Sequence, residues 1–94
     1  LRERQSLAST GVAVVQVRRG ENGVVPEDAL RIEAIGIPEW DVIGPEARRS
    51  VLDAVRASPS YTPVPELEAE LARRVGNLLR RGGRYRPRVV VFLD

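Results

Sequence analysis

The feature that most constrains this sequence is an apolar run near its C-terminal end, Val89-Val90-Val91-Phe92-Leu93, which contains no polar residue. Successive side chains of a strand point to opposite faces, so this run predicts a strand that needs cover on both faces. Ahead of it, an amphipathic helical pattern beginning near Pro65 is interrupted by Gly82-Gly83. The rest of the chain has to supply the cover for this strand.

The size and composition predict one small globular domain. The chain has 94 residues, and 43% of them are hydrophobic, as in ordinary folded domains. A domain of this size buries roughly 60 to 65% of its unfolded surface, so the core is thin. Only four residues are aromatic, namely Trp40, Tyr61, Tyr85 and Phe92. The core is therefore expected to be aliphatic.

The charged and sulfur-containing residues exclude several classes of site. All fifteen basic residues are arginines and the net charge is +2; this uniform use of arginine is most simply explained by a GC-rich genome. The chain has no Cys and no His, which excludes disulfides and thiolate or imidazole metal sites. It also has no Met, which suggests a segment of a longer protein. No apolar run reaches the roughly 18 residues of a membrane span, so a cytoplasmic location is expected.

Two strands are predicted in the first half of the chain. Residues 11–18 begin with β-branched valines and continue into a polar alternation, and residues 29–37 alternate apolar and charged side chains. Asn22-Gly23 between them is a hairpin signal, so the two strands are expected to pair antiparallel. Gly36 is expected to form a bulge that changes which side chains face inward.

Two amphipathic helices are predicted in the second half. The first runs over residues 45–57, with Pro45 at its first position. Its apolar stripe consists of Ala47, Val51, Ala54 and Val55. The second begins after Thr62 and ends at Gly82. Its apolar stripe consists of Val64, Leu67, Leu71, Val75 and Leu78. Residues 38–44 are expected to be a connector, with Trp40 packed over an edge of the sheet.

The predicted order strand, strand, helix, helix, strand gives an α+β fold. We expect a two-layer sandwich in which a three-stranded sheet packs on two helices, with the last strand beside the first. The other sheet face carries valines that so small a domain cannot cover, so a partner is expected there. The candidate assembly surface consists of Val12, Val14, Val89, Val91 and Leu93.

The sequence predicts no catalytic and no metal-binding residues. Its acids fall on loops and solvated helix turns, so no carboxylate pair is expected to converge in one site. Its serines have no His to activate them. Gly82-Gly83 follows a helix rather than opening one, so it predicts a helix C-cap and not a phosphate loop.

An arginine cluster is the strongest functional signal in the residues themselves. Between Arg73 and Arg88 there are seven arginines and no acid. The candidate contacts to RNA or to a partner are Arg80, Arg81, Arg84, Tyr85, Arg86 and Arg88. RNA phosphates would bind such a patch with a salt-dependent affinity. The alternative is a solvated or partner-facing basic edge, since the C-termini of helices favour cations.

Two segments give the chain a resemblance to a known family. Residues 1–15 (LRERQSLASTGVAVV) are a charged run, a short polar turn with Gly and a valine-rich strand. Residues 71–94 contain an apolar and basic helix, an arginine-rich turn with Arg86-Pro87 and a final apolar strand that ends on Asp94. Both resemble the small C-terminal domain of bacterial ribonuclease J, and the order of elements agrees over the chain. Ala34 to Val42 departs from the pattern, because that family usually carries an Ile-Ser-Arg-Gly-Phe-like segment there.

The resemblance implies a part of a metallo-β-lactamase/β-CASP ribonuclease. Such enzymes hydrolyse RNA endonucleolytically and as 5′-to-3′ exonucleases in RNA processing and mRNA decay, with two zinc ions held in preceding domains. This segment would itself be non-catalytic and hold no cofactor. Residues 1–10 would be the linker from the catalytic region, and residues 11–94 an accessory domain for assembly into dimers or tetramers. The implied partners are further copies of the enzyme, its catalytic domains, and RNA as the substrate of the full-length protein.

Overall fold

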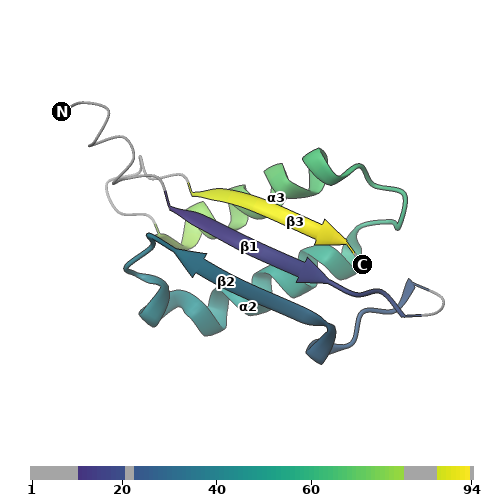
Figure 1. The fold of residues 1–94 in the computed structure, drawn as a ribbon, viewed down its shortest axis with the longest axis horizontal. Helices are drawn as coiled ribbons and strands as arrows, with labels where there is room; N and C mark the ends of the chain where they lie inside the picture. Colours follow the sequence, from purple (N-terminus) through teal and green to yellow (C-terminus); the bar gives the residue numbers. More distant parts are fainter. Residues whose placement is uncertain (1–10, 21–22, 80–86, 94) are drawn as a thin grey trace.

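The computed structural model describes residues 11–20, 23–79 and 87–93, and Figure 1 shows their arrangement in two layers. One layer is a sheet and the other is a pair of helices that lie together on one face of the sheet. The predicted two-layer α+β sandwich, with its element order, is confirmed. The elements in chain order are β1 (Val12–Val17), a short 3-10 helix η2 (Glu27–Ala29), β2 (Leu30–Ile35), α2 (Trp40–Ala57), α3 (Val64–Leu79) and β3 (Arg88–Leu93).

The sheet has the strand order β2-β1-β3. Strand β1 pairs antiparallel with β2, as predicted, and parallel with β3. Val15 at the centre of β1 is opposite Ile32 on one side and Val91 on the other. The predicted neighbourhood of the first and last strands is therefore confirmed, but β3 is also an edge strand of the described sheet.

The two faces of β3 have different surroundings, although the sequence of this strand is apolar throughout. Val89 and Val91 point to the helices and are buried. Val90 and Phe92 point to the other face, where Val90 is half-buried and Phe92 is 55% exposed. Cover on both faces was expected, but the described elements of this chain supply it on one face only.

The core is aliphatic, as the composition predicts. It lies between the helices and the sheet, and no polar side chain is buried among the described residues. The side chains with at most 2% exposure come from both layers and from the segment between β1 and η2: Ala13, Val15, Val17, Val25, Leu30, Ala47, Val51, Val55, Leu67, Leu71 and Val75. Each larger one contributes on the order of 1.5–3 kcal/mol when it leaves water. The predicted stripe of α3 ends differently, because Leu79 is buried at its end and Leu78 is only half-buried.

Helix α2 begins five residues earlier than the sequence predicts, at Trp40 instead of Pro45. Trp40 and Ile43 pack against the core and continue the apolar stripe of α2 by one turn. Pro45 therefore lies inside α2, where a proline disrupts the helix. Burial of Trp40 and Ile43 offsets this cost. The segment predicted as a connector is therefore largely helical.

Gly36 does not form the β-bulge that the sequence predicts. The pairing of β1 with β2 runs without interruption from Val12 opposite Ile35 to Val17 opposite Leu30. Gly36 follows the strand with a φ of 76°, a left-handed conformation that other residues adopt at a cost. The chain turns at this residue, and Ile37 enters the core while Ile35 stays exposed.

Candidate functional site

The candidate site is the open face of the sheet, the face that no described helix covers (Figure 1). The residue pairing places its side chains in three rows across the strands, each written in the order β2, β1, β3. The rows are Ile35–Val12–Arg88, Glu33–Val14–Val90 and Arg31–Gln16–Phe92. Residues two apart on a strand are about 6.6 Å apart, so the outer rows are separated by about 13 Å.

One end of the open face is apolar. We call Val12, Val14, Ile35 and Val90 the apolar patch. Its three valines are half-buried by their neighbours, and Ile35 is 58% exposed. The charged side chains of Glu33 and Arg88 lie on the same face at the two edges of the sheet. An apolar centre with a charged rim is typical of a surface that contacts another polypeptide.

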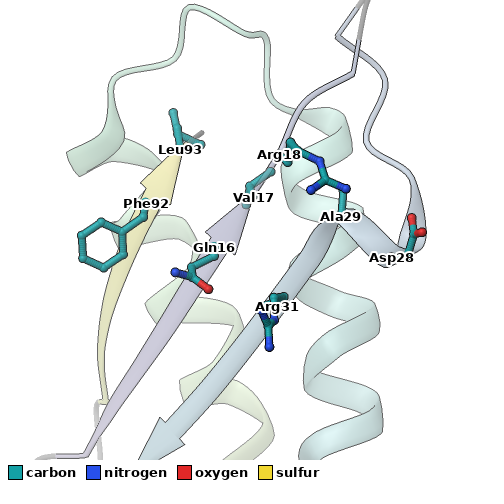
Figure 2. Close-up of a pocket in the computed structure, with 8 residues that line it drawn as sticks. All are labelled: Gln16, Val17, Arg18, Asp28, Ala29, Arg31, Phe92 and Leu93. Atoms are coloured by element: carbon teal, nitrogen blue, oxygen red, sulfur yellow. The ribbon is translucent and has the colours of Figure 1, made fainter.

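The other end of the open face is cationic and aromatic. A shallow cavity of about 410 Å³ lies there, with Gln16, Arg31 and Phe92 along it, one from each strand (Figure 2). Arg18, directly after β1, and Asp28, in η2, line the cavity on the side of β2. A second hollow, of about 380 Å³, shares Gln16 and Arg31 with the first and continues along β1 and β2 past Glu33.

The arginines of this end are available for a ligand. The ion pairs among the described residues are Arg73–Glu70 and Arg74–Glu70, both within α3. Neither Arg18 nor Arg31 is therefore paired with a described carboxylate, and both side chains are exposed. The cavity lining carries two guanidinium groups against one carboxylate, so an anionic ligand is favoured there.

The candidate assembly surface predicted from the sequence is divided between the two faces. Val12 and Val14 lie on the open face, but Val89 and Val91 are buried under the helices. Leu93 has the inward parity of Val89 and Val91, at the end of β3, and is 42% exposed. The five residues therefore do not form one surface. The prediction was wrong because the sequence of β3 is uniformly apolar and does not indicate which of its side chains point to the helices. Val90 and Phe92 take the outward places.

Most of the predicted arginine cluster lies outside the described residues, namely Arg80, Arg81, Arg84, Tyr85 and Arg86. Arg88 is described and is exposed on the open face. Arg73 and Arg74, at the beginning of the cluster, both donate hydrogen bonds to the carboxylate of Glu70. These bonds lower the pKa of Glu70 to about 2, and the same contact raises the pKa of Arg73. These two arginines are therefore partly neutralised.

The cationic and aromatic end of the open face was not predicted from the sequence. Its signal was present in the alternation of β1, where Val12 and Val14 are followed at the same parity by Gln16 and Arg18. Arg31 could be added to this group only through the pairing with β2, and Phe92 only through the parallel pairing with β3. Both contacts join residues far apart in the chain.

No group of three or more His, Cys, Asp or Glu side chains comes together within the described residues. None of the described helices is both long enough and apolar enough to cross a lipid bilayer.

Comparisons with models of protein families and with curated proteins find no match for this chain. The resemblance to ribonuclease J therefore stays a prediction from the sequence.

Proposed function

We propose that this chain is a non-catalytic accessory domain that helps a larger, ribonuclease J-like enzyme to assemble. The observation that supports the proposal is the apolar patch on the open face. Two of its four residues, Val12 and Val14, were already part of the surface expected from the sequence. The occupant of the patch would be a second copy of the same enzyme.

The size of the apolar patch favours a tethered contact over a free one. Full burial of a valine or isoleucine side chain stabilises by about 1.5–3 kcal/mol, and most of that surface is already covered in the valines. The patch would therefore contribute at most about 5 kcal/mol, whereas the association of two free proteins costs about 4–15 kcal/mol in lost freedom. Linkage to larger domains that also touch one another removes much of this cost. A patch of this size suits an accessory domain within an assembly.

The residues of this chain do not fit the pair of zinc ions that the resemblance implies for the complete enzyme. It has no His and no Cys, and its described carboxylates do not cluster. We assign no step of RNA hydrolysis to this chain, and any zinc ligands would belong to other domains. The chain alone is expected to leave RNA uncut in the presence of zinc, magnesium or manganese.

The test is the oligomeric state of the full-length enzyme that carries a charge in the patch. Val14→Glu and Val90→Glu each place a carboxylate in the middle row of the open face, and sedimentation velocity should show a shift to smaller species. Val42→Glu is the matched control, because Val42 is 82% exposed on α2, away from the open face. Circular dichroism confirms that all three variants are folded. An unchanged distribution of species for Val14→Glu and Val90→Glu would refute the assembly role.

A further inference from the structure

The row Arg31–Gln16–Phe92 places a cationic, an amide and an aromatic side chain next to one another on an exposed surface. Gln16 lies directly opposite Arg31 of β2 on one side and directly opposite Phe92 of β3 on the other. Adjacent strands are about 4.8 Å apart, so the Cα atoms of Arg31 and Phe92 are separated by about 10 Å. The three side chains border one cavity (Figure 2).

The ring of Phe92 has much of its surface free. Phe92 is 55% exposed, whereas the inward-pointing Val91 beside it is 5% exposed. An exposed aromatic ring on the face of a sheet is a platform on which a nucleobase can stack, and such stacking tolerates any base. The amide of Gln16 next to it can both donate and accept hydrogen bonds at the edge of a base.

The arginines supply the second half of the recognition. Arg18 and Arg31 line the cavity on the side opposite Phe92, and no described acid pairs with them. A guanidinium group binds phosphate oxygens in a bidentate geometry. Asp28 is the one acid in the lining. It lies in η2, on the far side of the cavity from Phe92, and leaves the lining with an excess of positive charge.

We propose that this end of the open face binds single-stranded nucleic acid, with a base on Phe92 and backbone phosphates on Arg18 and Arg31. A phosphate without a base would leave the ring unused, and an acidic peptide would gain little from stacking. The inference does not depend on the assembly role. The apolar patch occupies the other two rows of the open face, so one domain can use both ends of this face.

The experiment measures the binding of a fluorescein-labelled single-stranded RNA of about twelve nucleotides to this chain by fluorescence anisotropy over a range of salt concentrations. Arg18→Gln combined with Arg31→Gln should reduce affinity at low salt at least about tenfold and lower the magnitude of the salt slope by about 1.4. Phe92→Leu, which keeps an apolar side chain, should reduce affinity about 5- to 100-fold and leave the salt slope unchanged. The arginine variants should change the salt dependence of binding and Phe92→Leu should not, and this difference distinguishes phosphate contacts from stacking.

Two control variants test the position of the site. Arg49→Gln removes one charge from an exposed arginine of α2, away from the open face, and should leave affinity nearly unchanged. Replacement of Arg80, Arg81, Arg84 and Arg86 by Gln tests the segment between α3 and β3. If this second replacement abolishes binding while Arg18→Gln, Arg31→Gln and Phe92→Leu have no effect, the proposed site is wrong.

Three competitors identify the ligand. Excess unlabelled single-stranded DNA should compete, because both the base and the phosphate are retained. Competition by adenosine monophosphate at comparable nucleotide concentration would assign the site to a free nucleotide instead of a strand. Equal competition by a poly-glutamate peptide, unaffected by Phe92→Leu, would show an acidic protein surface and overturn the proposal. Absence of RNA binding at low salt would overturn it as well.

Discussion

The side-chain carboxylate of Glu68 in α3 accepts a hydrogen bond from the backbone N–H of Val91 in β3, with 2.9 Å between Oε2 and the nitrogen. Arg88, three residues earlier on the same strand, donates its N–H to the carbonyl of Gly11 on the side of β1. Because these directions alternate along a strand, the N–H of Val91 points away from the sheet. The hydrogen bond to Glu68 therefore satisfies the outward-pointing N–H of Val91, which another strand could otherwise use to pair with the edge of the sheet at β3.

Glu68→Ala should lower the free energy of unfolding by about 1–3 kcal/mol, because the N–H of Val91 loses a charged acceptor. Glu68→Gln keeps a carbonyl oxygen and should lose less. Ala is the better helix former, so helix propensity alone predicts the opposite order. Urea unfolding followed by circular dichroism measures the difference, and light scattering detects edge-to-edge association. Equal stability of the two variants would show that the contact does not protect β3.

The opposite edge of the sheet is protected by a cation. Arg48 in α2 donates to the carbonyl of Leu30 at 2.8 Å and also to the carbonyl of Glu27. Arg48→Ala should lower the free energy of unfolding by about 1–3 kcal/mol. The control is Arg49→Ala, which removes an exposed neighbour that makes no hydrogen bond within the described residues and should change stability by less than about 0.5 kcal/mol. Urea unfolding of both variants checks this, and equal losses would contradict it.

Glu70 should make the stability of the domain depend on pH under acid conditions. Its pKa is about 2 in the folded chain, against an ordinary value of 4.5, because of hydrogen bonds from Arg73 and Arg74. The unfolded chain therefore binds the proton more readily, so stabilisation by Glu70 is complete above pH 4.5 and declines as the pH falls toward 2. The effect should be small and weaker in high salt, since these side chains are partly exposed.

The check is the urea midpoint of the wild type and of Glu70→Gln between neutral and acid pH. The wild type should lose its advantage over Glu70→Gln as the solution is acidified. Other carboxylates titrate in both proteins, so only the difference between them is informative. A difference that stays constant across the acid range would rule out the contribution of this carboxylate.

Two glycines should respond in opposite directions to alanine. Gly36→Ala forces a Cβ into a backbone with a φ of 76° and should destabilise by about 1–2 kcal/mol. Gly44 lies within α2, and an added Cβ would be 3.6 Å from two atoms of the Trp40 ring, an ordinary contact. Gly44→Ala should therefore stabilise by up to about 1 kcal/mol. Thermal unfolding measures both shifts; a stabilising Gly36→Ala would contradict the role of Gly36 in the turn.

The sequence by itself determined the elements and the class of fold, because these depend on local periodicity. The alternation of the second strand and the stripe of Leu67, Leu71 and Val75 each predict which side chains are buried. Local rules were less reliable at the ends of helices. Pro45 predicted a helix start that burial of Trp40 overrides, and the stripe of α3 finishes on Leu79 instead of Leu78.

Only the tertiary structure decided how the open face is composed. The uniform run Val89 to Leu93 cannot indicate which side chains point inward, and the parallel pairing with β1 settles it by burying Val89 and Val91. The same pairing brings Phe92 beside Gln16 and Arg31. Contacts between strands far apart in the chain depend on the packing of the whole domain, which no short stretch of sequence encodes.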